Sequence, residues 1–92
     1  MKEELLTEAR TEINEIDRQL AELFVQRMKA VEKVAEYKKA HSMPIFDAKR
    51  EQQLLAKGAS AVEDAVLREY YVRFQQALMD VSKDYQQRLI SE

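Results

Sequence analysis

The sequence predicts an all-α fold, with three helices per subunit in one domain that spans residues 1–92. The chain has one glycine and one proline, with 46% hydrophobic and 35% charged residues, and this composition favours long helices over strands. Apolar residues also recur at the three- and four-residue spacing of a helical stripe. Because a chain of 92 residues exposes a large fraction of its surface when alone, we expect it to associate with a second copy.

The first expected helix is the longest and runs from about Glu3 to about Ala40. Neither glycine nor proline interrupts it, and its apolar stripe consists of Leu6, Ala9, Ile13, Ile16, Leu20, Leu23, Phe24, Val31 and Val34. At 1.5 Å per residue this helix is roughly 55 Å long, which is more than a domain of this size covers with its own chain. We therefore expect a partner to cover the excess.

Two shorter helices are expected after the segment that contains Pro44. The second helix runs from Asp47, as its N-terminal cap, to Lys57, and Gly58 is expected in the left-handed conformation just past its end. The residues from Ser60 to Glu63 have the pattern of a capping box, which predicts that a third helix begins there and continues to about Leu89.

Several classes of function are excluded by what the sequence lacks. It has no cysteine, no phosphate-binding glycine loop, no paired-histidine metal motif and only one histidine, so we expect neither a metal nor another cofactor. A net charge of −2 argues against general nucleic-acid binding. No apolar run approaches a membrane span and no signal-peptide segment begins the chain, so cytoplasmic is the expected location.

Arg27 stands at a position where the apolar seam of the first helix requires a leucine. Every seventh residue of that seam is apolar except this one, in the series Leu6, Ile13, Leu20, Arg27 and Val34. An unpaired guanidinium in a helix-packing seam costs several kcal/mol, so an anion is expected to meet it. That anion is either a protein carboxylate, which would make Arg27 a residue that sets the helix register, or a ligand.

Lys38 and Arg10 add two more cations beside the same seam. Lys38 lies about three turns after Arg27, and a separation of roughly 16 Å lets two long side chains converge on one small ligand. Arg10 is 28 residues from Lys38, or roughly 42 Å along a straight helix. If Arg10 serves the same site, it comes from another subunit, and an antiparallel pair of first helices would give two equivalent sites.

Two further pairs of polar residues lie one helical turn apart. Asp47 and Glu51 begin the second helix, and Ser82 and Gln86 share a face of the third. Taken singly, each has an ordinary structural interpretation: a helix cap for Asp47, a surface charge for Glu51 and half-exposed polar positions for the other two. Their joint occurrence with the three cations favours a binding site.

Four segments carry a resemblance to a known family. They are ARTEINEID (residues 9–17), the stretch 26–38 that holds Arg27 and Lys38, PIFDAKRE (44–51) and SKDYQQ (82–87). Together they resemble the all-helical chorismate mutases over nearly the whole chain, in register apart from the connection between the second and third helices. The resemblance implies an intertwined antiparallel homodimer of three-helix subunits, which converts chorismate to prephenate on the route to phenylalanine and tyrosine.

The resemblance also implies a role for each polar residue. Arg27 and Arg10 of the partner subunit would bind the substrate carboxylates, with help from Ser82 at the ring carboxylate. Lys38 and Gln86 would donate hydrogen bonds to the ether oxygen of the breaking bond, and Lys38 would also touch the enolpyruvyl carboxylate.

The ring hydroxyl would be held from the start of the second helix. The resemblance assigns it to Asp47, through its backbone, and to the side chain of Glu51. Arg50 resembles a supporting charge without a direct role. Phe46 stands where some relatives have a cation, which implies that extra electrostatic help is absent there.

The reaction agrees with the residues that the sequence offers. A pericyclic rearrangement needs no nucleophile, metal or cofactor, but it needs a flexible dianion held in its reactive shape and donors aimed at the ether oxygen. Because Gln86 does not titrate, we expect activity to persist across neutral pH. Two alternatives remain open: an isochorismate pyruvate lyase of the same fold, and a non-catalytic helical dimerisation or regulatory module.

Overall fold

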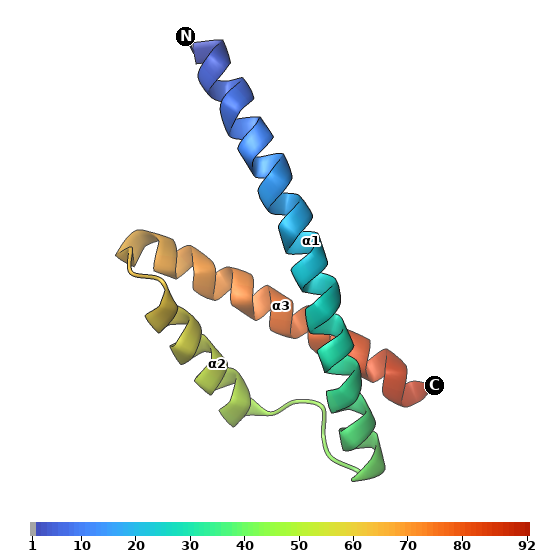
Figure 1. Cartoon of the computed structure of the whole chain (residues 1–92). Helices are drawn as coiled ribbons and strands as arrows, with labels where there is room; N and C mark the ends of the chain where they lie inside the picture. The colour runs from blue at the N-terminus through green and yellow to red at the C-terminus, as the bar shows by residue number, and fades with distance from the viewer. Residues whose placement is uncertain (1) are drawn as a thin grey trace. The chain divides into compact units, whose positions relative to one another are not determined.

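The computed structural model describes residues 2–92 and is helical throughout its regular segments. Helix α1 spans Lys2–Ala40, α2 spans Ala48–Ala61 and α3 spans Ala65–Ser91 (Figure 1). No strand occurs between residues 2 and 92. The prediction of an all-α fold with one very long first helix is therefore confirmed. The homodimer stays a prediction.

The chain forms two compact units, Met1–Ala30 and Val31–Glu92. The first unit consists of the N-terminal three quarters of α1, and the second contains the end of α1 with α2 and α3. That residues 1–92 form a single domain stays a prediction.

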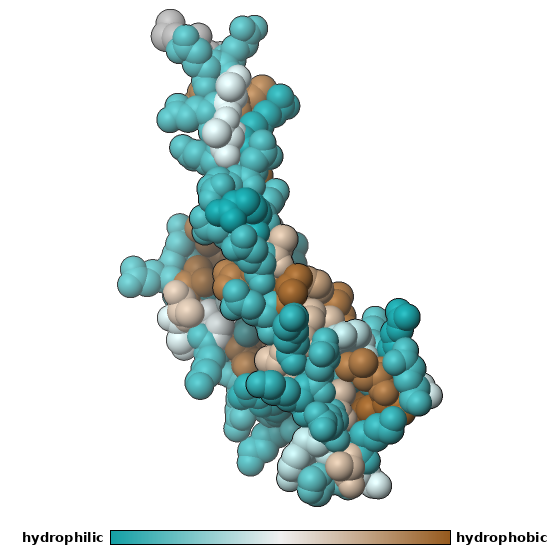
Figure 2. Space-filling view, turned by 45° about the vertical axis from the view of Figure 1, so that its right-hand side comes forward, coloured by the Kyte–Doolittle hydropathy of each residue, from teal (hydrophilic) through white to brown (hydrophobic). Residues whose placement is uncertain are grey.

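The first unit is a solvent-exposed helix with an uncovered apolar stripe. Arg18 bridges Glu15 and Glu22 at 2.6 and 2.7 Å, and such pairs one turn apart support a helix locally. The large apolar side chains of this unit are 40–68% exposed; they are Leu5, Leu6, Ile13, Ile16, Leu20, Leu23, Phe24 and Val25. Figure 2 shows apolar side chains open between hydrophilic ones along this helix.

The second unit is held together by the packing of α2 against α3, which run side by side in opposite directions (Figure 1). Its buried apolar residues are Val31, Ala35 and Met79. Tyr85 on α3 donates a hydrogen bond of 2.7 Å to the Glu32 carboxylate on α1, which links these two helices within the unit. The second unit therefore has internal contacts that the first unit lacks.

The prediction that α2 ends at Lys57 is wrong. The helix continues to Ala61, and Gly58 lies inside it without a positive φ. Gly58 is buried because α3 approaches closely: a Cβ atom there would lie 2.8 Å from Cδ of Gln75 and 2.9 Å from Cε2 of Tyr71. The glycine is thus required by helix packing rather than by a turn.

The predicted capping box at Ser60–Glu63 is also wrong. Ser60 lies in α2, where its hydroxyl donates to the Ala56 carbonyl, and the N-terminal cap of α3 is Asp64. The Asp64 carboxylate accepts hydrogen bonds from the backbone N–H groups of Val66 and Leu67 at 2.9 and 3.0 Å. A carboxylate at this position pairs with unsatisfied N–H groups and with the positive end of the helix dipole, so the helix begins at Ala65.

Candidate functional site

Lys38 lies in the last turn of α1 and forms a hydrogen bond with the connection to α2. Its half-buried side chain donates a hydrogen bond of 2.6 Å from Nζ to the Ile45 carbonyl oxygen. Its own carbonyl accepts a hydrogen bond of 2.9 Å from the backbone N–H of Met43. An ammonium group has three donors, so Lys38 retains donors for a ligand while it holds this connection.

Asp47 caps α2, as the sequence predicts. Its carboxylate accepts a hydrogen bond of 3.0 Å from the Arg50 backbone N–H, and its carbonyl accepts one of 3.0 Å from the backbone N–H of Glu51. The carboxylate and the carbonyl of Asp47 thus both hold the first turn of α2, and the role of Asp47 in ligand binding stays a prediction.

Glu51 is held between α2 and α3 by two residues that the sequence analysis did not single out. Lys83 places its ammonium 3.0 Å from Oε2 of Glu51, and Gln76 donates a long hydrogen bond of 3.5 Å to Oε1. The hydrogen bond to Glu51 is the main cause that raises the pKa of Lys83 above its ordinary value. Glu51 and Lys83 are 32 positions apart, and no local sequence pattern indicates that they pair.

Phe46 also contacts Lys83. The Lys83 ammonium lies 4.9 Å from the centroid of the Phe46 ring, within the range of a cation–π interaction. A positive charge from α3 is therefore present beside position 46, even though that position itself has no charge.

Ser82 and Gln86 are the buried polar residues of α3, with 5% and 7% of their surface exposed. The Ser82 hydroxyl donates a hydrogen bond of 2.7 Å to the Leu78 carbonyl. The side-chain oxygen of Gln86 is buried and has no hydrogen-bond partner in the structure. A buried polar atom without a partner costs about 1–3 kcal/mol, and the side-chain oxygen of Gln75, which is not a predicted site residue, is unpartnered in the same way.

Five of the seven predicted site residues lie in the second unit, on elements that contact one another. Lys38 binds the connection that leads to Asp47, and Glu51 binds α3 at the residue after Ser82. Arg27 and Arg10 lie in the first unit, where Arg27 is half-buried and Arg10 is exposed. Their participation in the same site stays a prediction.

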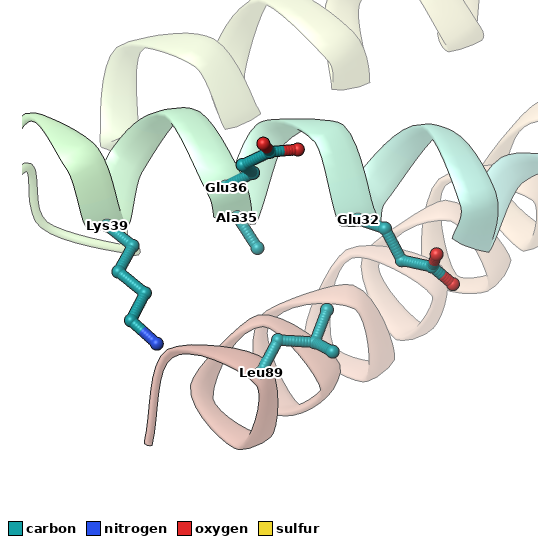
Figure 3. Close-up of a pocket in the computed structure, with 5 residues that line it drawn as sticks. All are labelled: Glu32, Ala35, Glu36, Lys39 and Leu89. Carbon is teal, nitrogen blue, oxygen red and sulfur yellow. The ribbon is translucent and has the colours of Figure 1, made fainter. Parts of the chain in front are cut away.

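A cavity of about 240 Å³ lies elsewhere in the second unit, between the end of α1 and the end of α3 (Figure 3). It is lined by Glu32, Ala35, Glu36, Lys39 and Leu89, none of which is a predicted site residue. In Figure 3, Lys39 extends from α1 toward the end of α3, and Leu89 points from α3 toward α1. The cavity is therefore separate from the residues that the sequence predicts.

Neither a metal cluster nor a membrane-spanning helix is found in the described residues. No group of three or more histidine, cysteine, aspartate or glutamate side chains is placed to hold a metal ion in that part of the chain. None of the helices between residues 2 and 92 is long and apolar enough to cross a membrane.

Comparison with known families identifies the fold. A family model described as chorismate mutase type II matches residues 9–87. The chain belongs to the chorismate mutase type II family. The match contains all seven predicted site residues, from Arg10 to Gln86, and confirms the family resemblance of the sequence.

One curated relative of this family member is the T-protein of Haemophilus influenzae. The two are 38% identical over 52 residues, which cover 56% of this chain and 14% of the T-protein. The chain therefore spans only a small part of the length of that relative. No solved structure matches the chain.

Proposed function

We propose that this chain catalyses the Claisen rearrangement of chorismate to prephenate, as a homodimer with two equivalent sites. The observation that carries the proposal is the family match over residues 9–87, which includes every polar residue that the sequence singles out. The burial of Gln86 supports it, because its side-chain amide places hydrogen-bond donors in the interior of the second unit.

Lys38 and Gln86 donate hydrogen bonds to the ether oxygen of chorismate, where negative charge develops as the bond breaks. Gln86 comes from the buried face of α3, and Lys38 has donors left beyond its bond to the Ile45 carbonyl. Donors aimed at a developing charge in a partly dry site accelerate a reaction more than donors in water. These two residues therefore supply the part of the binding that strengthens in the transition state.

The two carboxylates of chorismate are bound by cations from two subunits. Arg27 and Arg10 of the partner subunit bind these carboxylates, and Ser82 helps at the ring carboxylate. Guanidinium groups pair with carboxylates through two parallel hydrogen bonds, which fixes the orientation of the substrate as well as its position. Arg27 and Arg10 enter this proposal through the family and the helical spacing.

The ring hydroxyl is held at the start of α2. Glu51 accepts a hydrogen bond from it, and the backbone of Asp47 provides a second contact, as the family resemblance implies. With its carboxylates fixed, the substrate is confined to the bent shape in which the two reacting carbons approach, and the hydroxyl contact anchors the ring equally in the ground state and the transition state. The reaction breaks one C–O bond and forms one C–C bond within the same molecule, so no external group exchanges atoms with it.

The hydrogen bonds proposed here are strong enough to supply a large part of the barrier lowering that an enzyme needs. Enzymes lower barriers by at least about 8 kcal/mol, and each charge-assisted hydrogen bond supplies roughly 1.5–3 kcal/mol when it strengthens in the transition state. The remainder comes from the entropy of holding the dianion in a reactive conformation. The proposed residues therefore need no metal or cofactor to reach this range.

The homodimer follows from the uncovered stripe of the first unit. Its large apolar side chains are 40–68% exposed, and because full burial of such a side chain is worth about 1.5–3 kcal/mol, covering each one contributes about half of that. A contiguous exposed apolar surface of this kind marks an interaction site. A second copy in antiparallel orientation covers the stripe and carries its Arg10 toward the Arg27 region of the first copy.

The test is an assay that follows loss of chorismate and identifies the product. Prephenate without pyruvate supports the proposal, whereas pyruvate released from isochorismate supports the lyase alternative. No conversion of either substrate supports a non-catalytic module. These three outcomes are distinct in a single pair of reactions.

A variant at Arg27 then separates catalysis from assembly. We expect Arg27→Ala to lose turnover while it remains dimeric, and Arg18→Ala serves as the control, because Arg18 is an exposed arginine of the same helix that pairs with Glu15 and Glu22. If Arg27→Ala loses only dimerisation, Arg27 sets the helix register and the assignment to substrate binding is wrong.

A further inference from the structure

Lys83 lies at the centre of a polar network between α2 and α3. Its ammonium is 3.0 Å from Oε2 of Glu51 and 3.4 Å from Oδ1 of Asp80. Gln76 joins the same two carboxylates, with Nε2 at 3.5 Å from Oε1 of Glu51 and 3.1 Å from Oδ1 of Asp80. Both oxygens of Glu51 are thus oriented by side chains of α3.

Within this network the Lys83–Glu51 pair is more enclosed than the Arg18–Glu15 pair of α1. The side chains of Lys83 and Glu51 are 28% and 16% exposed, whereas those of Arg18 and Glu15 are 56% and 55% exposed. The Phe46 ring, 4.9 Å from the Lys83 ammonium, contributes to this enclosure. An ion pair shielded from water is screened less by salt and holds its geometry better than a surface pair.

We propose that Lys83 is a positioning residue that fixes the Glu51 carboxylate for the substrate hydroxyl. The inference rests on the proposed function, and it goes beyond it because Lys83 acts through Glu51 rather than on the reacting atoms. A carboxylate has about four lone-pair sites. Lys83 and Gln76 engage one site on each oxygen, so acceptor capacity remains for a hydroxyl donor.

Lys83 has a second effect through its charge. Chorismate carries two negative charges, and an uncompensated Glu51 carboxylate in the site would repel it. The ammonium at 3.0 Å offsets that repulsion while it leaves Glu51 ionised as an acceptor. Removal of the ammonium therefore weakens binding by freeing the carboxylate to rotate and by exposing its charge to the dianion.

These effects belong to substrate binding rather than to the chemical step. The hydroxyl contact is the same in the ground state and the transition state, so its loss changes KM and leaves kcat unchanged. This separation distinguishes Lys83 from Lys38 and Gln86, whose loss lowers kcat. It also distinguishes positioning from a general loss of folded protein, which lowers apparent kcat without a change in KM.

The test compares Lys83→Met with Lys83→Arg. Methionine keeps an unbranched side chain against Phe46 and removes the charge, and we expect it to raise KM for chorismate about fivefold with kcat within about twofold of wild type. Arginine restores the ion pair and returns KM toward the wild-type value. Lys57→Met is the control, because Lys57 is an exposed lysine of α2.

A double-mutant cycle with Glu51→Gln completes the test. If Lys83 acts through Glu51, Lys83→Met adds no further increase in KM once the carboxylate is gone. Lys83→Gln replaces the methionine variant if the latter does not fold, since glutamine keeps a donor without the charge.

Each outcome decides the inference. An unchanged KM in Lys83→Met, or a KM increase that persists in full in the Glu51→Gln background, overturns it while the proposed function stands. A fall in kcat per folded chain, with the folded fraction measured by circular dichroism and KM unchanged, places Lys83 at the reacting atoms and also overturns it. A wild-type chain that does not convert chorismate overturns the proposed function and this inference together.

Discussion

The two units of the chain differ in where their side chains find partners. In Val31–Glu92, side chains of different helices bind one another through Glu51 with Lys83 and through Tyr85 with Glu32, and Lys38 binds the backbone of the connection to α2. In Met1–Ala30, the described ion pairs link Arg18 to residues of the same helix, and the large apolar side chains are exposed. The second unit is thus organised by its own contacts, whereas the first unit presents a surface that suits a second copy. The residues proposed as donors to the ether oxygen lie in the second unit, and the expected dimer interface lies in the first.

The largest expected effect comes from Gln86 in the second unit. A glutamate at this buried position is ionised at neutral pH and offers no proton to the ether oxygen, so we expect Gln86→Glu to lose about 10²-fold or more in kcat at pH 8. Burial raises the pKa of the new carboxyl group, and protonation below that pKa restores a donor. Activity should therefore rise as the pH falls, in a pH–rate profile measured between pH 4.5 and 8.

The wild-type profile is the matched control for this variant. Gln86 does not titrate, so wild-type activity should persist across the neutral range while the variant falls. A Gln86→Glu chain with wild-type activity at pH 8 would show that this residue does not donate to the reacting oxygen.

The next effect tests the first unit. Leu20 is 43% exposed on the uncovered stripe, and Leu20→Glu places a charge in the expected interface. We expect the variant to become monomeric in sedimentation and to lose at least about tenfold in activity, because each site then lacks Arg10 of the partner subunit. Gln19→Glu adds the same charge at a neighbouring exposed polar position and should remain a dimer.

A monomeric chain that converts chorismate at the full rate would contradict the role of the first unit. In that case the second unit and Arg27 would be sufficient for the reaction, and the exposed stripe would serve another purpose. Because the mass and the rate are measured on the same sample, the two results are directly comparable.

The sequence was sufficient to predict features that depend on local chemistry. The continuous apolar stripe and the absence of glycine or proline predict α1 almost to the residue, and Asp47 caps α2 because its carboxylate reaches an N–H group three residues away. The seven site residues are identified by the family resemblance, and the family match contains all of them. Their roles stay predictions.

Features that depend on contacts between distant residues were missed. Gly58 follows a helical pattern, so the sequence predicts a C-terminal cap there. The residue is in fact a glycine because the side chains of Tyr71 and Gln75, on another helix, leave no room for a Cβ atom. Lys83 looks like an exposed charge until α2 places Glu51 beside it. Periodicity gives the face of one helix and carries no information about which residue of another helix opposes it.

Gly58→Ala measures the close approach of α2 and α3. Alanine gains about 1 kcal/mol of helix propensity over glycine, but its Cβ atom would lie 2.9 Å from the Tyr71 ring, and overpacking of this kind costs about 1–3 kcal/mol. We expect a net loss of about 1 kcal/mol in the free energy of unfolding, measured by urea denaturation. In a Gln75→Ala, Tyr71→Ala background the same change should become stabilising.

An effect as small as that at Gly58 is expected at Asp64, which caps α3 away from the proposed site. Asp64→Ala removes the acceptor for the N–H groups of Val66 and Leu67, and we expect a loss of about 1 kcal/mol in the free energy of unfolding. KM and kcat should remain at their wild-type values, in contrast to variants of Glu51 or Gln86. Asp84→Ala, at an exposed position inside α3, is the control and should change the unfolding free energy by less. If Asp64→Ala raised KM as Lys83→Met is expected to, the start of α3 would be coupled to the Glu51 network, and the separation of cap and site within the second unit would be wrong.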